Sequence, residues 1–456
     1  MAHLAHDPDK IPDNRTTMDL KTVLPLTACV AEGGNLCVGG VDLVELALSE
    51  GTALYVMDEV HVRTQLQRFR TAFRDKETDA QVVYAGKAFV NRYMARLVNE
   101  EGCWLDVSSG GELYVALAAG FPAERVIAHG NNKSLNELTE ALDAGVGRIA
   151  VDSFEELEHV NVLAEQRGLV QPILLRIKPG IMTDTHAFVI TGAEDSKFGF
   201  GIADGTALEA IRRADQCPNI KLKGLHVHIG SQIFSLASFE HTIEVMVALM
   251  ATVRDDSGIE FSEFDLGGGL GAAYAPEHEP PSIEEYVKHV ASTLKTQCEA
   301  KGLTVPFLFI EPGRAVVANA GVTLYTVGAI KDLPGIRTFV AVNGGMTDNI
   351  RTALYDAHYE AVIASKSMWP RNKIVTLAGK HCESGDVVAI DTALQTPEVG
   401  DIVCVLATGA YCYTMSSNYN KQVRPAVYFV RDGKARLAVR RETYEDLLHC
   451  DVFESA

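Results

Sequence analysis

The sequence predicts an α/β fold in which a (β/α)8 barrel is inserted in a β domain, sandwich-like or barrel-like, built from both chain ends. The first observation is that short apolar runs alternate with segments of helical periodicity between residues 52 and 320. Apolar strands separated by helices are typical of a parallel sheet, and about eight such repeats make a barrel. The second observation is that both flanks are rich in short β-like runs broken by Gly and Pro. We therefore expect the β domain at residues 1–50 and 321–456 and the barrel at 51–320.

The expected elements can be placed along the chain. The apolar runs expected to form barrel strands are Ala53–Met57, Gln81–Ala85, Trp104–Val107, Val126–His129, Arg148–Val151, Ile173–Ile177, Gly224–Ile229, Glu263–Leu266 and Phe307–Ile310. Helical segments between them include Asn136–Ala144 and Ser153–Arg167, and the second opens with a serine cap and acids in its first turn. In the β domain we expect strands at Ala320–Val327, Thr338–Val342, Ile402–Ala407 and Ala426–Val430, and a closing helix at Tyr444–His449.

The composition indicates a globular protein of two domains with no nucleic-acid or membrane partner. The net charge of −19 over 456 residues argues against an anionic partner, which would need basic patches. The most apolar runs carry charges or break short of a membrane span, and the amino terminus, with Asp7, Asp9 and Asp13, lacks a signal-peptide core. Nine cysteines without a C-x-x-C pair suit reduced thiols and predict no metal site. We expect a cytoplasmic protein.

Lys87 is the first residue that points to chemistry. It follows the apolar run Val82–Ala85, and a lysine buried in a strand-built core is costly unless it is paired or used. The usual use is a Schiff base with a carbonyl, and pyridoxal phosphate is the commonest carbonyl cofactor. The alternative is a lysine that ends a strand and reaches solvent along its apolar stem.

Two turns after predicted strands add polar and glycine-rich candidates. Gly267–Gly269 follows the strand that ends at Leu266, and its amides could form an anion-binding nest or merely a turn. In the turn Glu311–Arg314, the acid could hydrogen-bond a protonated pyridine nitrogen, which keeps the ring an electron sink. Arg314 could bind a carboxylate or phosphate with both arms of its fork, and the alternative for the whole turn is an ordinary salt-bridged loop.

A pair of histidines ends another predicted strand. Period-two alternation puts His226 and His228 on one face, which we take to be the barrel interior. His228 lies nearer the carboxyl end of the strand and could stack on a flat cofactor, whereas His226 is interpreted as a core residue. Ser231 could donate to a phosphate.

The β domain carries a further group of candidates. Cys382 lies in a turn of acidic and small residues, where neighbouring carboxylates disfavour a thiolate and suit a proton donor. The alternative is a buried thiol in a charged turn. Further polar candidates, each more often structural than catalytic, are Arg351, Tyr355, Tyr411 and Tyr413.

Taken together, the motifs resemble the diaminopimelate decarboxylases, within the alanine-racemase-like and ornithine-decarboxylase-like pyridoxal-phosphate enzymes of fold type III. The resemblance runs from about residue 20 to residue 447. Its motifs are Y-A-G-K-A at 84–88, H-G-N-N-K-S at 129–134, S-K-F-G at 196–199, G-L-H-V-H-I-G-S-Q at 224–232, D-L-G-G-G-L-G at 265–271, E-P-G-R at 311–314, H-C-E-S-G-D at 381–386 and G-A-Y-C-Y-T-M-S-S-N-Y-N at 409–420.

The resemblance implies pyridoxal-phosphate-dependent decarboxylation of meso-2,6-diaminopimelate to L-lysine and CO2, the last step of lysine biosynthesis. It implies a homodimer with shared active sites, in which Lys87 carries the cofactor and Cys382 reprotonates the α carbon. The residues that it implies for cofactor binding are Lys87, His228, Ser231, Gly268, Gly269, Glu311, Pro312, Gly313, Arg314 and Tyr411. Those for the substrate are Arg314, Arg351, Tyr355, Tyr411 and Glu383, of which Glu383, like Cys382, comes from the partner subunit.

Two positions depart from the family pattern: Asn343 stands where an aspartate is usual, and Thr352 follows Arg351 where a proline is usual. Three rivals stay open. The first is a decarboxylase of another basic amino acid, such as ornithine, arginine or carboxynorspermidine; the presence of Arg351 together with Glu383 disfavours the simple diamines. The second is a racemase, for which a second base paired with Lys87 is missing. The third is a non-catalytic look-alike, which would be expected to have lost Lys87, Glu311 or Cys382.

Overall fold

The structure is a computed structural model that describes residues 10–12, 14–76, 78–181 and 195–453. Asp7, Asp9 and Asp13, on which the amino-terminal expectation rests, lie outside these residues. The chain forms two compact units, one of residues 63–271 and 279–315 and one of residues 1–62, 272–278 and 316–456. The functional limits of the domains, expected near residues 50 and 320, stay a prediction.

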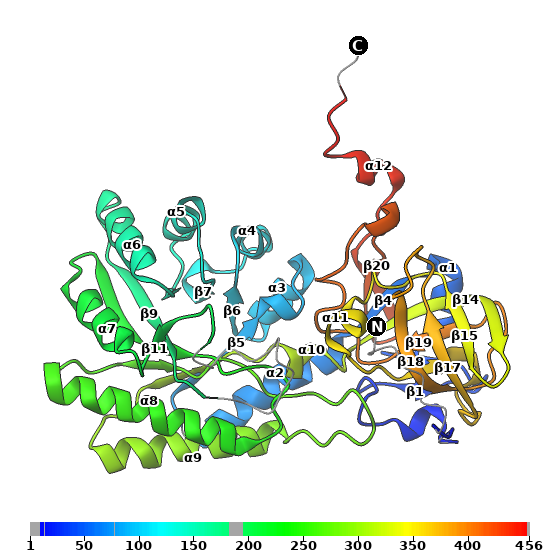
Figure 1. The fold of residues 1–456 in the computed structure, drawn as a ribbon, viewed down its shortest axis with the longest axis horizontal. Helices are drawn as coiled ribbons and strands as arrows, with labels where there is room; N and C mark the ends of the chain where they lie inside the picture. Colours follow the sequence, from blue (N-terminus) through cyan, green and yellow to red (C-terminus); the bar gives the residue numbers. More distant parts are fainter. Residues whose placement is uncertain (1–9, 13, 77, 182–194, 454–456) are drawn as a thin grey trace. The chain divides into compact units, whose positions relative to one another are not determined.

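The first unit is a closed barrel of eight parallel strands, as predicted (Figure 1). Hydrogen bonds between β13 and β5, and between β8 and β9, complete the ring. The strands are β5 (Ala80–Ala85), β6 (Trp104–Val107), β7 (Val126–Ala128), β8 (Arg148–Val151), β9 (Gln171–Lys178), β11 (Ile220–Val227), β12 (Glu263–Asp265) and β13 (Phe307–Ile310). The short strand β10 (Phe200–Gly201) pairs with β9 in parallel.

Helices between the strands form the outer layer of the barrel (Figure 1). They are α2 (Glu59–Arg74), which begins in the other unit, α3 (Arg92–Glu100), α4 (Gly110–Ala118), α5 (Leu135–Ala144), α6 (Phe154–Gln166), α7 (Thr206–Gln216), α8 (Leu236–Ser257) and α9 (Ile283–Lys301). The predicted cap of α6 is present, because the Ser153 side chain accepts a hydrogen bond from the Glu156 amide. A short helix, α10 (Arg314–Val317), follows β13.

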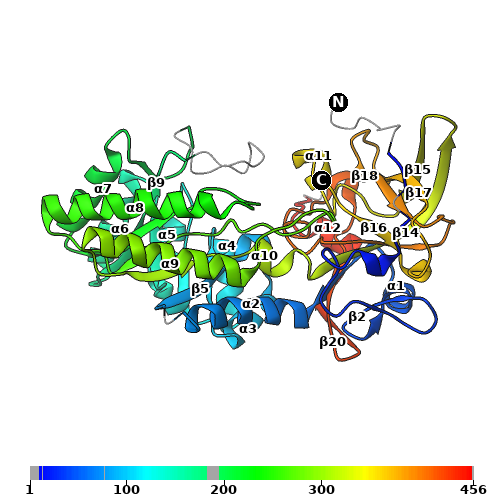
Figure 2. The same ribbon diagram turned by 90° about the horizontal axis from the view of Figure 1, so that it is seen from below.

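Helix α8 corrects one expectation about apolar runs. Its 22 residues are long and apolar enough to cross a membrane by length and composition. Half of the most apolar window is buried, and α8 lies beside α9 in both views (Figures 1 and 2). We therefore interpret it as a core helix whose apolar face packs within the barrel unit.

The second unit is built around a mixed β-sheet from both ends of the chain, as predicted. Its central order is β18-β17-β15-β14-β4-β20-β21, and β19 pairs with β14 and β16. The strands are β4 (Leu54–Asp58), β14 (Gly321–Leu333), β15 (Arg337–Val342), β16 (Ala361–Ile363), β17 (Lys373–Ala378), β18 (Val387–Leu394), β19 (Ile402–Val405), β20 (Ala426–Arg431) and β21 (Lys434–Val439). A separate sheet holds β1 (Cys29–Val30), β2 (Leu36–Val38) and β3 (Val41–Asp42).

The helices of this unit are short: α1 (Leu43–Glu50), α11 (Arg351–Tyr355) and α12 (Tyr444–Leu448), the last at the predicted closing helix. One predicted barrel strand is wrong. The run Ala53–Met57 does form a strand, β4, but β4 pairs with β14 and β20 in the mixed sheet. A short apolar run that is buried on both faces suits either sheet, and only its distant partners decide between them.

Candidate active site

The barrel candidates lie where the strands end, which is where barrel enzymes place their sites. Lys87 sits in a single 3-10 turn, Gly86–Ala88, directly after β5. Its side chain is exposed, so the expectation of a lysine buried in the strand core is wrong. The strand ends at Ala85, and the turn carries the ammonium out of the core to the rim of the barrel.

His226 and His228 occupy successive depths at the end of β11. His226 is only 1% exposed, whereas His228 is half-buried just beyond the strand. The Gly268 amide donates to Nδ1 of His228 over 3.2 Å, which fixes the ring as an acceptor at that atom. Burial, reinforced by the charges of Lys87 and Arg176, holds the pKa of His228 well below its usual value, so the ring is neutral.

Glu311, directly after β13, is a buried carboxylate held between two histidines. Its Oε1 lies 2.6 Å from Nε2 of His129, with an N–H direction that is poor for a hydrogen bond. Its Oε2 lies 3.3 Å from Nε2 of His226. Burial alone would raise the pKa of Glu311, but its interactions with His129 and His226 outweigh burial and hold the pKa well below the usual range. The carboxylate is therefore ionised.

The glycine turn after β12 packs so closely on its neighbours that side chains are excluded. A Cβ on Gly268 would lie 2.3 Å from the Glu311 carbonyl oxygen, and one on Gly269 would lie 2.7 Å from the Gly230 carbonyl oxygen. Gly269 also has a φ of +118°, which favours glycine. Backbone is thus brought to the barrel mouth with no side chain in between.

The turn 311–314 joins this region to the lysine. The Pro312 carbonyl accepts a hydrogen bond from the Ala85 amide over 3.2 Å, and a Cβ on Gly313 would lie 3.0 Å from the Cβ atoms of Ala85 and Ala88. Arg314 is buried and donates twice to Oγ of Ser231, from Nε over 3.2 Å and from Nη2 over 3.0 Å. A serine hydroxyl and a guanidinium therefore lie together at the ends of β11 and β13.

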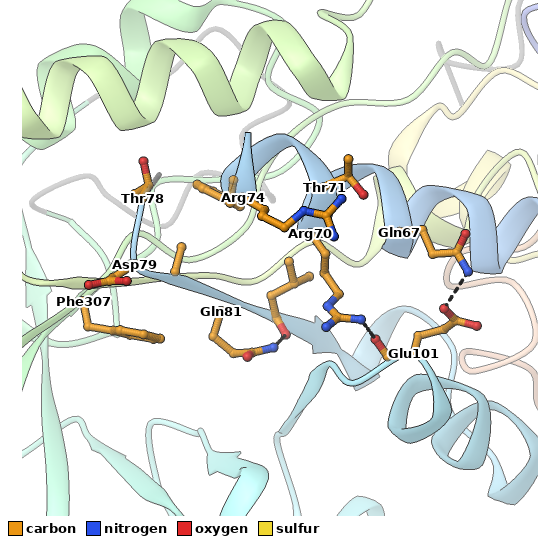
Figure 3. Close-up of a pocket in the computed structure, with 12 residues that line it drawn as sticks. Gln67, Arg70, Thr71, Arg74, Thr78, Asp79, Gln81, Glu101 and Phe307 are labelled. Carbon is orange, nitrogen blue, oxygen red and sulfur yellow. Dashed lines mark hydrogen bonds between the residues drawn. The ribbon is translucent and has the colours of Figure 1, made fainter. Parts of the chain in front are cut away.

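A cavity of about 710 Å³ opens at the other end of the barrel (Figure 3). It is lined by the starts of β5 and β13, including Asp79 and Phe307, and by Arg70 and Arg74 of α2. None of the predicted site residues lines it. Because barrel chemistry is found at the carboxyl ends of the strands, this cavity is not the candidate active site.

In the β unit the structure brings three of the predicted residues together around Arg351. Its guanidinium carbon lies 5.2 Å from the ring centroids of both Tyr355 and Tyr411. Its Nε donates to the Tyr359 hydroxyl over 2.9 Å, and its two terminal nitrogens donate to no described residue. The side chain is nevertheless buried. Tyr411 has a φ of +67°, a strained conformation for a tyrosine of the kind found at functional sites.

Cys382 and Glu383 lie instead on an exposed turn before β18. The turn is anchored by the buried Asp386, whose Oδ2 accepts from the amide and from Nδ1 of His381, each over 2.8 Å. Its Oδ1 accepts from the Met346 amide over 2.6 Å. The alternative of a buried thiol is thus not met, and the thiol is presented to solvent from a fixed turn.

The two departures from the family pattern are accommodated locally. Asn343 accepts from the Thr326 amide over 2.9 Å and donates to the Thr52 carbonyl over 3.1 Å. An ionised aspartate could make only the first of these bonds. Thr352 donates to the Val388 carbonyl over 2.7 Å, which ties α11 to β18 without the stiffness of a proline.

Four polar residues of the barrel mouth escaped the sequence analysis as site residues: Asp106, His129, Arg176 and Asp265. All four are buried within or just beyond the last residues of barrel strands. Burial raises the pKa of Asp106 to about 7, while burial and then the Glu311 charge raise the pKa of Asp265 well above its usual value. A polar residue at the end of an apolar strand indicates a site residue in a barrel. By this pattern the sequence pointed to Glu311 and the β11 histidines, and it would also have pointed to these four.

Comparisons with known proteins agree with one another. Residues 59–318 match the family model described as the pyridoxal-binding domain of pyridoxal-dependent decarboxylases. The chain is 46% identical to the diaminopimelate decarboxylase of Bacillus subtilis, over 92% of this chain and 95% of the relative. It is 44% identical to that of Mycobacterium tuberculosis, over 94% and 98%. The structure superposes on diaminopimelate decarboxylase from M. jannaschii, solved with L-lysine, with a TM-score of 0.87, 33% identity and coverage of 94% and 98%. The chain therefore belongs to the diaminopimelate decarboxylases, which are pyridoxal-dependent carboxy-lyases.

Proposed function

We propose that this enzyme decarboxylates meso-2,6-diaminopimelate to L-lysine and CO2, the last step of lysine biosynthesis. The observation that carries the proposal is the buried Arg351, whose terminal nitrogens donate to no described residue. A buried guanidinium that is not fully paired is costly, and its fork fits a carboxylate. A substrate with a second amino-acid end supplies that carboxylate, and ornithine or arginine does not.

The residues of the barrel mouth fit pyridoxal phosphate. The buried, ionised Glu311 suits a protonated ring nitrogen, and the neutral ring of His228 can lie against the ring face. The glycine turn leaves room for a close approach by a phosphate, which Gly268, Gly269, Ser231 and the turn Glu311, Pro312, Gly313 and Arg314 would bind, with Tyr411 near it. Lys87 would hold the cofactor covalently.

When bound, the cofactor supplies an electron sink for the pair released as the carbon–carboxylate bond breaks. The chain keeps that sink active through Glu311, whose charge favours a protonated ring nitrogen. Lys87 would supply the amine that holds the cofactor when no substrate is bound. Cys382 donates a proton to the α carbon, from which the carboxylate has left.

The far end of the substrate is the basis for specificity. Arg351 or Arg314 would bind its carboxylate, with Tyr355 and Tyr411 as walls, and Glu383 would bind its ammonium. We propose a homodimer with shared active sites. In each site, Glu383 of the partner subunit and Cys382 of the partner subunit would complete the set of residues. We also propose that the enzyme is cytoplasmic.

Product analysis tests the proposal. Purified protein with pyridoxal phosphate is given meso-diaminopimelate, ornithine and arginine in parallel. We expect L-lysine from the first and no product from the others, because an unpaired buried Arg351 rejects them. Formation of putrescine or agmatine would refute the proposed substrate. No product from any of the three amino acids would refute the proposed decarboxylase activity.

A matched pair of arginine variants tests the carrying observation. Arg351→Met should lower kcat/KM on meso-diaminopimelate by about 10- to 100-fold, the worth of hydrogen bonds to a charged group. Arg167→Met is the control, because Arg167 pairs with the exposed Asp143 on the outside of the barrel. Equal effects of the two variants on kcat/KM would show that Arg351 does not bind the substrate.

A further inference from the structure

Four titratable side chains meet in the barrel mouth, each from the end of a different strand: His129 after β7, His226 on β11, Asp265 on β12 and Glu311 after β13. Their ligand atoms all lie within 4.8 Å of one another, and all four side chains are buried. The rings of His129 and His226 lie edge to face at 4.7 Å between centroids. Four strands of the barrel thus converge on one carboxylate, that of Glu311.

The charges in this cluster are unequal. The charges of Glu311 and Asp106 outweigh burial and raise the pKa of His129, whereas burial lowers that of His226 to about 3. The protonated form of His129 is therefore favoured beside Glu311, and His226 is a neutral ring that can donate through Nε2. Asp265 stays protonated because burial and the Glu311 charge both disfavour a second anion. Asp106, Arg176 and His228 also act on Glu311 or its histidines, and Arg176 lies 3.7 Å from Asp152.

The contacts leave Glu311 little freedom. One oxygen faces His129 and the other faces His226, so rotation of the carboxylate would break both contacts. A carboxylate has about four acceptor positions; Nε2 of His226 contacts one on Oε2, and Nε2 of His129 lies against Oε1 as an ion-pair partner. The Glu311 amide is also fixed, since it donates to the Gly267 carbonyl over 2.8 Å. The remaining acceptor positions are thus presented in a fixed direction.

We propose that His129 and His226 are positioning residues that hold the Glu311 carboxylate for the ring nitrogen of pyridoxal phosphate. The inference rests on the proposed function and deepens it. It gives His226, the first histidine of the G-L-H-V-H motif, a role other than filling the core. It also predicts that both histidines act on one atom of the cofactor, the ring nitrogen, and through one residue.

That prediction can be tested with two cofactors. Apoprotein, treated with a chelator because the same four side chains could hold a metal ion, is titrated with pyridoxal phosphate and with an analogue that has carbon in place of the ring nitrogen. We expect His226→Leu and His129→Leu each to weaken binding of pyridoxal phosphate by about tenfold or more, the worth of a hydrogen bond to a charged group. Binding of the analogue should be unchanged, because it offers Glu311 no ring N–H.

Conservative and control variants separate positioning from packing. His226→Gln keeps a donor and should retain most of the affinity for pyridoxal phosphate. His289→Leu removes a histidine that pairs with Glu240 on the outside of the barrel and should affect neither cofactor. In a Glu311→Gln background the two leucine variants should have no further effect. If a leucine variant does not fold, the His129→Phe and His226→Phe variants, which keep a ring but have no donor, carry the same comparison with the two cofactors.

Two results would overturn the proposal. One is an equal loss of affinity for both cofactors, which would mean that the histidines only pack the barrel. The other is unchanged affinity for pyridoxal phosphate in both leucine variants. Failure of the proposed function would look different, because the wild-type protein would then bind no pyridoxal phosphate or form no L-lysine.

Discussion

Gly268 offers a direct test of how tightly the strand ends fix the site. A methyl group at this position would lie 2.3 Å from the Glu311 carbonyl oxygen, whereas ordinary contacts begin at 3.4 Å. Backbone cannot swing away as a flexible side chain can, so the two segments must separate by about 1 Å. Since the same segment carries the Glu311 side chain, Gly268→Ala should move the carboxylate relative to His129 and His226.

The expected cost has two parts. Overpacking should destabilise the barrel by about 1–3 kcal/mol. A displacement of about 1 Å at a reacting centre costs on the order of 100-fold in rate, so kcat/KM on meso-diaminopimelate should fall by about that factor, with weaker cofactor binding. The assay is L-lysine formation with saturating pyridoxal phosphate, beside a direct cofactor titration and a thermal melt.

A matched glycine serves as control. A Cβ on Gly111, in α4 of the same unit, would meet only Oγ of Ser109 at 3.7 Å, an ordinary contact. Gly111→Ala should leave kcat/KM and cofactor affinity unchanged and should not lower the melting temperature. Wild-type kinetics and cofactor affinity in a folded Gly268→Ala protein would refute the reasoning, because the strands would then relax without moving Glu311.

Four further predictions follow from the same structure. Lys87→Ala should abolish turnover and the visible absorbance of bound cofactor, and turnover at the wild-type rate would exclude the lysine. Cys382→Ala should slow L-lysine formation while cofactor stays bound, whereas loss of cofactor would make the thiol structural. Mixing these two variants should restore activity above that of either if sites are shared, and verified mixed dimers without recovery would argue against sharing. Burial would raise the pKa of Glu360, but His358 and Arg371 lower it to about 2 from 4.5. Its stabilisation is therefore present above pH 4.5 and lost as the pH falls toward 2, so the melting-temperature gap between wild type and Glu360→Gln should close over that window.

Local patterns predicted the barrel well because each strand and helix records its own periodicity. Eight of the nine predicted barrel strands are present, and the cap at Ser153 is satisfied as expected. The ninth, β4, could not be assigned because its partners β14 and β20 lie more than 250 residues away in the chain. No local pattern carries that pairing.

The sequence predicted those site residues that lie in a recognisable motif. It did not predict those whose role depends on being buried next to residues distant in the chain. The turn after β13 pointed to Glu311 directly, but nothing near His129 or Asp265 in the chain indicates that they meet this carboxylate. Lys87 shows the opposite error. Its position after an apolar run suggested burial, yet a single 3-10 turn takes it to the surface.

Buried charged and polar groups of two kinds occur in the structure: those whose hydrogen bonds are satisfied within the protein, and those that lack a partner. In the β unit, Arg371 is fully buried and bonded to Glu360 and to the Ala393 carbonyl, so the pair is satisfied and needs no ligand. In the barrel mouth, Oδ1 of Asp106 and Nδ1 of His226 are buried without a hydrogen-bond partner among the described residues. Such groups cost about 1–3 kcal/mol each, and an apolar core would be more stable. Unlike the satisfied pair, these groups cost stability, and they lie at the strand ends, where a barrel enzyme binds its cofactor and substrate.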